Sequence, residues 1–314
     1  MKPTSQILCL GEAMVEFVRQ PDGITFRQGF GGDTSNAAIA AARQGASTAY
    51  VSAVGKDRFG ADLLALWQSE NVDTGYVRES SDAPTGIYFI DPDPVARQFT
   101  YYRAGSAASR MVPDDLNMRG LAASEILHLS GITLAVSADL RRTADAAMQH
   151  CAANGVAVSL DTNYRKQLWP ADRAAAVLAD AMRWARIVFT SIDDQMTLSG
   201  QDDPARIARR IHGLGPEIVV ITMGGEGAHL SVAGNGQHVP AAPCNPVDST
   251  GAGDTFAGAF LAWWQETGDP VAAARLAGIA AAGTVSGYGA IDAIPTRGRV
   301  LDTATQLGLS VPEY

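Results

Sequence analysis

The sequence predicts an α/β protein in which helices cover both faces of a mainly parallel β-sheet, with a small additional β-sheet beside it. Between residues 126 and 222, short apolar runs alternate with segments of helical length, a pattern typical of buried parallel strands joined by helices. Before residue 105, two pairs of strand-like runs follow each other without a helix inside either pair, which favours a separate sheet. We therefore expect residues 1–11, 33–83 and 105–314 to form an α/β domain, and residues 12–32 and 84–104 to form a β lid inserted in two pieces.

The first half of the chain combines apolar strands with turn and cap residues. The turn sequence Pro21-Asp22-Gly23 separates two short strands, and Asp33 opens a helix rich in alanine. The predicted elements are, in order, strands at 7–11, 14–18 and 24–28, a helix from residue 33, a strand at 48–53, a helix at 61–71, and strands at 85–91 and 97–103.

The second half is a regular alternation that ends in two helices rich in small residues. The predicted strands are 126–130, 156–161, 187–190 and 218–222, and the predicted helices are 138–154, 173–184, 193–198, 204–213, a helix starting at the glycines of 251–253, and 271–285. Parallel strands of this kind bind ligands at their carboxyl ends. Three of those ends carry polar sequences, DTNYR at 161–165, TSIDD at 190–194 and TMGGEG at 222–227.

Composition excludes several classes of partner. The net charge of −9 over 314 residues argues against a nucleic-acid or anionic-membrane surface. No apolar run has membrane-spanning length, and the start of the chain does not have the pattern of a signal peptide. The three cysteines are scattered without a CxxC pair, which favours a reducing compartment. We expect a cytoplasmic protein that binds neither nucleic acid nor membrane.

Residues 246–260, PVDSTGAGDTFAGAF, contain the strongest chemical signal. Gly251-Ala252-Gly253 precede an apolar helix, so the free N–H groups of the first turn can approach a phosphate or an oxyanion closely. Asp254 would repel such an anion, and it therefore makes more sense as a base that accepts a proton beside the developing charge. The alternative is that Asp254 only stabilises the first turn of its own helix.

Several segments together resemble the ribokinase-like (PfkB) family of sugar kinases. DSTGAGDTF resembles the C-terminal signature of that family, and GGDTSN at 31–36 resembles its GGxxxN motif. Residues 54–60 match the VGxDxxG loop, DTNYR resembles DxNxR, and the resemblance extends from residue 7 to about residue 295. It implies a ribokinase-like fold and a kinase that uses ATP and Mg²⁺, and it leaves a monovalent-cation requirement open.

The resemblance implies roles for individual residues. In the family, the Gly-Ala-Gly turn (here Gly251, Ala252 and Gly253) forms the anion hole for the transferred phosphoryl group, and the aspartate (Asp254) activates the sugar hydroxyl. The expected substrate contacts are Gly32, Asp33, Asn36, Tyr88, Tyr101, Arg103, Arg165 and Asp254. The expected nucleotide contacts are Ser191, Thr222, Gly224, Gly225, Gly227, Thr250, Gly251, Gly253 and Gly289. Asp194 stands where the family has the glutamate of NxxE, and we expect it to hold Mg²⁺ through water.

Local positive charge suggests the substrate. Alternation along residues 97–103 places Tyr101 and Arg103 on one face of a strand, and Arg165 follows a strand end. Two desolvated guanidinium groups suit a carboxylate better than a neutral sugar, and YYRAGSAAS at 101–109 favours the sugar-acid branch of the family. We expect ATP-dependent phosphorylation of the terminal hydroxyl of 2-keto-3-deoxygluconate.

Other readings stay open at the level of sequence. Arg103 and Arg165 can instead bind phosphate groups or lie on the protein surface. The enzyme can also be a fructokinase, a ribokinase or a 5-dehydro-2-deoxygluconokinase. A catalytically inactive sugar- or nucleotide-binding regulator is a different class, against which the intact Asp254 counts. An unpaired lid would expose an apolar face, so we also expect a homo-oligomer formed through the β lid.

Overall fold

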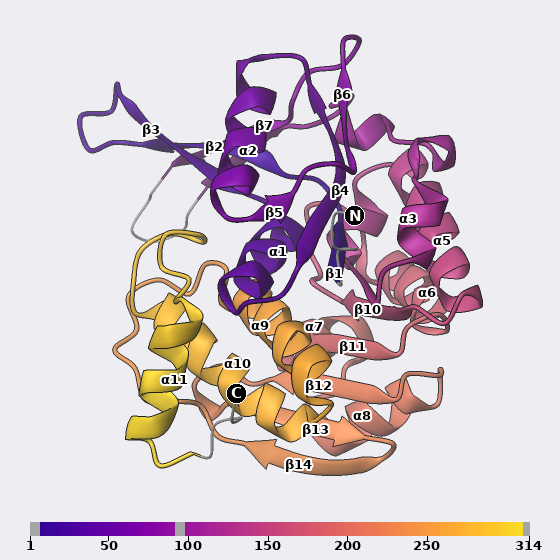
Figure 1. The fold of residues 1–314 in the computed structure, drawn as a ribbon, viewed down its shortest axis with the longest axis vertical. Coiled ribbons are helices and arrows are strands. Elements are labelled where there is room, and N and C mark those ends of the chain that lie inside the picture. Colours follow the sequence, from indigo (N-terminus) through magenta and orange to yellow (C-terminus); the bar gives the residue numbers. More distant parts are fainter. Residues whose placement is uncertain (1–6, 92–97, 310–314) are drawn as a thin grey trace.

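A computed structural model describes residues 7–91 and 98–309 of the chain. Its large sheet has the strand order β14-β13-β12-β11-β10-β9-β1-β4-β5, with β6 paired to β4 (Figure 1). The strands are β1 (Ile7–Leu10), β4 (Thr48–Gly55), β5 (Val72–Asp73), β6 (Val77–Ser80), β9 (Ile126–Ser130), β10 (Ala157–Asp161), β11 (Ile187–Ser191), β12 (Ile218–Thr222), β13 (Ala228–Val232) and β14 (Asn235–Val239). The pairings β12–β13 and β13–β14 are antiparallel and the others are parallel. The predicted mainly parallel sheet is therefore confirmed.

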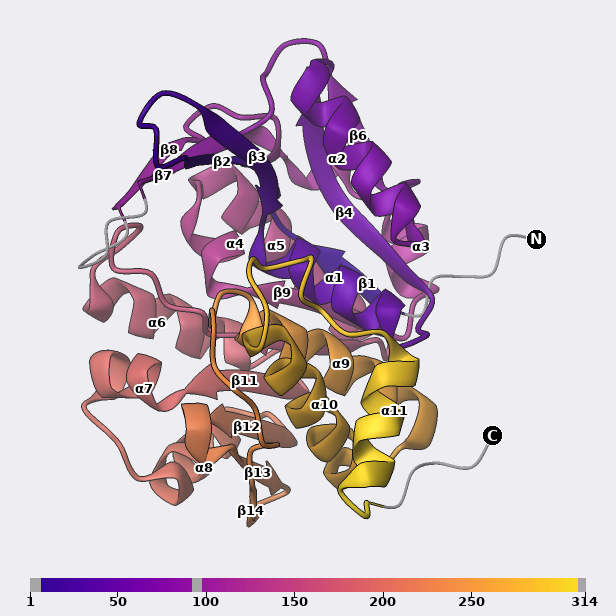
Figure 2. The same ribbon diagram turned by 90° about the vertical axis from the view of Figure 1, so that its left-hand side faces the viewer.

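Helices cover both faces of this sheet, as the alternating pattern predicted (Figure 2). One face carries α1 (Asp33–Arg43), α2 (Arg58–Ser69), α9 (Ala252–Thr267), α10 (Pro270–Val285) and α11 (Arg297–Gln306). The other carries α3 (Met118–Ala122), α4 (Gly131–Ala135), α5 (Ala138–Ala153), α6 (Ala171–Met182), α7 (Ile192–Ser199) and α8 (Pro204–His212). Strand β1 shows why two cores form: Ile7 and Cys9 pack into the first, whereas Leu8 and Leu10 pack into the second.

Helices α1 and α9 touch through their backbones. Four alanines of the predicted helix α1 are completely buried: Ala37, Ala38, Ala40 and Ala41. At Gly258 of α9 an added Cβ atom would lie 2.1 Å from the carbonyl oxygen of Ala37, so only glycine permits this approach. The contact fixes the distance between the first turns of the two helices, where Asn36 and Asp254 are located.

A separate small sheet has the order β3-β2-β7-β8, with β2 (Met14–Arg19), β3 (Phe26–Gly31), β7 (Ile87–Asp91) and β8 (Gln98–Tyr102). Strand β3 begins two residues later than predicted because the Asp22 carboxylate accepts hydrogen bonds from the backbone of Ile24 and Thr25, which holds residues 22–25 in a turn. Strands β2 and β7 are parallel and join the two predicted pairs into one sheet. Residues 92–97, expected to form the turn between the last two strands, lie outside the described residues.

Some elements were not predicted from the sequence, among them the hairpin of β13 and β14. Its strands contain histidine, asparagine and glutamine, and its two-residue turn places Ala233 at φ 48° and Gly234 at φ 87°. The short strands β5 and β6 and the helices α3, α4 and α11 were also missed, since short polar or alanine-containing segments carry a weak periodic signal. Within residues 7–91 and 98–309, no helix has the length and apolar character needed to cross a membrane.

Candidate active site

A cavity of about 980 Å³ lies where the carboxyl ends of the parallel strands face the small sheet. Its walls come from the link between β1 and β2, the start of α1, the strands β7 and β8, the ends of β10, β11 and β12, and the start of α9. We call the part lined by Glu12, Tyr88, Tyr101 and Arg103 the small-sheet end, and the part lined by Ser191, Asp194, Thr222 and Gly224 the large-sheet end.

Most of the residues singled out in the sequence meet in this cavity. Those that line it are Gly32, Asp33, Asn36, Tyr88, Tyr101, Arg103, Arg165, Ser191, Asp194, Thr222, Gly224, Thr250, Gly251, Gly253 and Asp254. Ala252, Gly225, Gly227 and Gly289 are not on its wall. Gly227 has φ 96°, and an added Cβ would lie 2.2 Å from the carbonyl oxygen of Val239, so it serves the packing of the backbone against β14. The Gly289 N–H donates to Asp248 at 3.3 Å.

The first turn of α9 is built to present backbone N–H groups. Gly251 is the N-cap residue in the left-handed region at φ 77°, and no side chain caps the helix. An added Cβ at Gly251 would lie 2.9 Å from the carbonyl oxygen of Ala290, so a side chain there would be strained by conformation and by crowding. The uncapped turn carries the partial positive charge of a helix N-terminus and suits a phosphate or an oxyanion.

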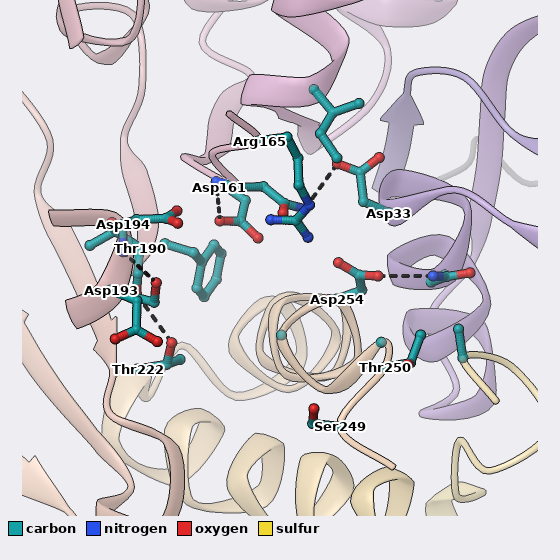
Figure 3. Close-up of a pocket in the computed structure, with 18 of the residues that line it drawn as sticks. Asp33, Asp161, Arg165, Thr190, Asp193, Asp194, Thr222, Ser249, Thr250 and Asp254 are labelled. Atoms are coloured by element: carbon teal, nitrogen blue, oxygen red, sulfur yellow. Dashed lines mark hydrogen bonds between the residues drawn. The ribbon is translucent and has the colours of Figure 1, made fainter. Parts of the chain in front are cut away.

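Asp254 lies in this turn with its carboxylate toward the cavity (Figure 3). Its Oδ2 accepts a hydrogen bond from Nδ2 of Asn36 at 2.8 Å. Burial, and then the neighbouring Asp33 carboxylate, raise the pKa of Asp254 to about 7, while the bond from Asn36 and the charge of Arg165 act in the opposite direction. A carboxylate with this pKa can accept a proton near neutral pH more effectively than an ordinary aspartate.

Other carboxylates surround Asp254. Burial, followed by the charges of Asp194, Asp254 and Asp33, raises the pKa of Asp161 well above its usual range. Asp161 was not predicted as a site residue, although it is the first residue of the DTNYR segment. In the view of Figure 3, the guanidinium of Arg165 lies between Asp161 and Asp33, above Asp254. The site is therefore rich in carboxyl groups, and the Arg165 guanidinium faces them.

At the small-sheet end, aromatic rings and charged groups contact one another. Tyr88 and Tyr101 face each other across β7 and β8, and their rings stack with centroids 5.5 Å apart. The Tyr88 hydroxyl donates to Glu16 at 2.5 Å, and the Arg103 guanidinium lies 5.6 Å from the centre of the Tyr101 ring. Tyr101 and Arg103 thus share a face of the sheet, as the alternation predicted.

Arg103 is not the unpaired cation that the sequence led us to expect. Its Nε donates to Oε2 of Glu12 at 2.7 Å, and the side chain of Glu12 is completely buried. Arg103 is therefore already neutralised by a residue that the sequence analysis did not identify. Arg165, by contrast, is exposed, and its guanidinium donates to the carbonyl of Tyr164 at 2.9 Å.

At the large-sheet end, the polar side chains bond to the protein itself. The Ser191 hydroxyl accepts from the N–H of Asp194 at 3.0 Å and caps α7. Oδ2 of Asp194 accepts from the Thr162 hydroxyl at 2.7 Å and from the N–H of Tyr164 at 3.1 Å. The Thr222 hydroxyl donates to the carbonyl of Thr190 at 3.3 Å.

The donor set at this end fits a largely hydrated Mg²⁺. Across residues 7–91 and 98–309, no group of three or more histidine, cysteine, aspartate or glutamate side chains is arranged to hold a metal. Mg²⁺ commonly keeps several waters and uses one or two carboxylates together with substrate phosphates. In the described residues the hydrogen bonds of Asp194 use only Oδ2, so its other oxygen can accept from a metal-bound water.

Comparison with known proteins identifies relatives over almost the whole chain. The sequence matches the model of the pfkB family carbohydrate kinases over residues 4–297. It is 33% identical to a 2-dehydro-3-deoxygluconokinase of Thermoproteus tenax over 301 residues, which cover 92% of this chain and 91% of that protein. It is 32% identical to a 2-dehydro-3-deoxygluconokinase of Escherichia coli K12, with 92% and 97% covered. A crystal structure of a fructokinase with bound ATP from Xylella fastidiosa superposes with a TM-score of 0.90 at 26% identity, covering 97% of this chain and 99% of that one.

Proposed function

This chain belongs to the pfkB family of carbohydrate kinases, and on that premise we propose that it transfers the γ-phosphoryl group of ATP to the terminal hydroxyl of 2-keto-3-deoxygluconate. The observation that carries the catalytic part is the position of Asp254, a carboxylate with a pKa of about 7 in the uncapped first turn of α9. Relatives named as 2-dehydro-3-deoxygluconokinases support the choice of substrate.

The proposed reaction is a direct displacement. The terminal hydroxyl gives its proton to Asp254 as its oxygen bonds to the γ-phosphorus, and the bond to the bridging oxygen of ADP breaks. The N–H groups of Gly251 and Gly253 stabilise the charge on the transferred group, since both residues line the cavity at a helix N-terminus. The N–H of Ala252, by contrast, donates to the carbonyl of Ser249 at 3.2 Å. Such a reaction requires alignment and charge stabilisation more than covalent chemistry from the protein.

We assign the remaining residues by their place in the cavity. Asp33 and Asn36 of α1 and the side chains of the small-sheet end lie nearest to where the sugar would meet Asp254. Ser191, Thr222 and Gly224 at the large-sheet end would face the nucleotide. Asp194 would hold Mg²⁺ through water, and the bound metal would neutralise phosphate charge.

Arg165 supports a sugar acid as the substrate. It is exposed and it lines the cavity. Burial raises the pKa of Asp254 and of Tyr101, and the charge of Arg165 opposes both rises, so Arg165 acts on groups at both sides of the expected sugar. A carboxylate on the ligand would give this guanidinium a charged partner. Fructose is the second candidate because Glu12 cancels the charge of Arg103, which leaves the small-sheet end closer to neutral than the sequence suggested.

A kinase assay with a panel of acceptors tests the proposal. ADP release is measured with 2-keto-3-deoxygluconate, fructose, ribose and 5-dehydro-2-deoxygluconate at fixed ATP and Mg²⁺. We expect kcat/KM for the keto acid to exceed that for each other sugar by at least tenfold, which corresponds to about 1.4 kcal/mol of selectivity. A preference for fructose or ribose would replace the sugar-acid function with a neutral-sugar kinase. Binding of ATP without turnover of any acceptor would instead favour the regulator.

We also propose that the described part of the predicted lid, residues 12–32, 84–91 and 98–104, closes over the sugar and pairs with a second copy of the chain. Large apolar side chains are exposed on the small sheet and its turn, among them Ile24, Phe99 and Tyr102 at 81%, 44% and 63% exposure. Such groups favour a covered surface. Light scattering should give a dimer or larger assembly, and a monomer at micromolar concentration would contradict the pairing.

A further inference from the structure

Glu12 occupies an unusual place between the two sheets. It follows β1 and precedes β2, at the first point where the chain leaves the large sheet for the small one. Its side chain is completely buried, and a buried carboxylate is stable only when charged or hydrogen-bonding partners satisfy it. Its partners therefore show what it holds in place.

Both carboxylate oxygens of Glu12 bind the point where the chain returns to the large sheet. Oε2 accepts from Nε of Arg103 at 2.7 Å and forms an ion pair with a terminal guanidinium nitrogen at 2.5 Å. Oε1 accepts from the hydroxyl of Ser106 at 2.6 Å. Arg103 directly follows β8, so one carboxylate joins the first and the last passage between the sheets.

The two remaining passages contact Glu12 as well. Gly32 follows β3, and an added Cβ there would lie 2.8 Å from the carbonyl oxygen of Glu12. Gly86 precedes β7, and an added Cβ there would lie 3.0 Å from Oε1 of Glu12. All four passages of the described chain between the sheets therefore meet around this residue.

We propose that Glu12 is a positioning residue that sets the small sheet over the sugar and holds the Arg103 guanidinium at the cavity wall. This inference rests on the proposed function, in which the sugar lies at the small-sheet end. Glu12 acts through Arg103, because both oxygens of its buried carboxylate are already bonded to Arg103 and Ser106. Its loss affects sugar binding, whereas the large-sheet end keeps its geometry.

A double-mutant cycle between Glu12 and Arg103 tests this role. Glu12→Gln keeps the shape of the side chain and removes the charge that fixes Arg103. We expect Glu12→Gln and Arg103→Gln each to raise the KM for the sugar about tenfold, with the KM for ATP changed less than twofold. The KM of the double variant for the sugar should be no more than about twofold above that of the single variant with the higher KM, because both changes remove the same contact. Effects that multiply to about a hundredfold would overturn the proposal.

Glu70→Gln is the matched control. Glu70 also forms a two-bonded pair with an arginine, at 2.7 and 2.8 Å to Arg43, and both side chains are 19% exposed. Glu70 does not line the cavity, so its variant should lose thermal stability and keep the KM for the sugar within twofold. An equal rise in that KM for Glu70→Gln would show that the Glu12 effect is general destabilisation.

A milder variant covers the case in which Glu12→Gln does not fold. Ser106→Ala removes one donor to Glu12 and leaves the pair with Arg103 intact, so we expect about a threefold rise in the KM for the sugar and an unchanged KM for ATP. A wild-type KM in this variant, or equal rises for sugar and ATP, would contradict the positioning role. The measurements use whichever sugar the wild-type enzyme phosphorylates best, so a preference for fructose would refute the proposed substrate and leave this test valid.

Discussion

The small-sheet end of the cavity is built from large side chains that contact one another, whereas the large-sheet end is built from strand termini and glycine backbone. Tyr88 and Tyr101 stack on each other, Tyr88 bonds to the half-buried Glu16, and Arg103 bonds to the buried Glu12. Ser191 and Thr222 turn their hydroxyl groups toward the protein, and Gly224 offers only backbone. One end can therefore select a ligand by side-chain chemistry, and the other mainly by shape.

This difference indicates where substitutions should matter. A ligand phosphate needs N–H groups and space, which the backbone supplies whatever the side chains are. A sugar is distinguished from its isomers only by the positions of its hydroxyl and carboxylate groups, so the protein must hold matching side chains in place. In the proposed reaction Asp254 belongs to both ends, because it would accept a proton from one ligand beside the phosphoryl group of the other.

The largest effect should come from Asp254→Asn. The variant keeps the shape of the side chain and removes the proton acceptor, so kcat should fall about 10²-fold or more while ATP binding stays near normal. Steady-state kinetics together with nucleotide binding by calorimetry would check this. If most of kcat survives, Asp254 is not the base.

A change of pH should have the next largest effect on the rate. Because the pKa of Asp254 is about 7, we expect kcat/KM to fall about tenfold for each pH unit below 7 and to level off above it. In the unfolded chain Asp254 has a pKa near 4, so between about pH 4 and 7 the folded state binds a proton that the unfolded state has lost. The contribution of Asp254 to the free energy of unfolding therefore falls as the pH rises from about 4 to 7. Thermal unfolding should then show Asp254→Asn gaining stability relative to wild type between pH 5 and pH 8, and a constant difference would contradict the shift.

Gly251→Ala tests whether backbone shape alone governs the phosphate side. Alanine is strained at φ 77°, and its Cβ would crowd Ala290, so we expect kcat to fall about tenfold or more. Gly268→Ala at the other end of α9 is the control, since Gly268 has φ 67° with nothing within 4 Å of an added Cβ. Similar losses of kcat in both variants would mean that conformational strain, rather than the anion hole, is responsible.

Arg165→Ala and Arg103→Ala separate free charge from paired charge. Each should raise the KM for the keto acid about tenfold and leave the KM for ATP almost unchanged. Of these two arginines, only Arg165 lacks a carboxylate partner in the described protein. Its loss alone should therefore lower the ratio of kcat/KM for the keto acid to kcat/KM for fructose. Equal loss of selectivity in both variants would contradict the neutralisation of Arg103 by Glu12.

Thr222→Val should have the smallest effect. The Thr222 hydroxyl already donates to the carbonyl of Thr190, so its removal should change the KM for ATP by less than about threefold. Nucleotide titrations of the wild type and the variant would measure this. A tenfold or greater rise would show that side chains also select ligands at the large-sheet end.

The parts of the site that were predictable depend on local sequence. Asp254 and the glycines before it lie within four residues of one another and at the start of an apolar helix, so their pattern predicts their arrangement. The alternation along residues 97–103 likewise placed Tyr101 in β8 and Arg103 directly after it on one face. Strong periodicity made the main strands predictable for the same reason.

The parts that were missed depend on contacts between distant residues. Glu12 meets partners 91 and 94 positions away along the chain, and nothing in its neighbourhood signals that meeting. The pKa of Asp161 is raised by burial and then by three carboxylates from other elements. The hairpin of β13 and β14 was missed because its apolar residues are too few to produce a clear alternation.

The close approach of α1 and α9 at Gly258 makes the geometry of the proposed catalytic residues depend on a contact outside the cavity. A methyl group at this position cannot fit against Ala37 without separating the two helices, and those helices carry the amide and the carboxylate that bond at 2.8 Å. The packing distance between α1 and α9 therefore sets the position of Asp254, the proposed proton acceptor, relative to Asn36. A larger residue at Gly258 should therefore lower turnover even though it touches neither ligand.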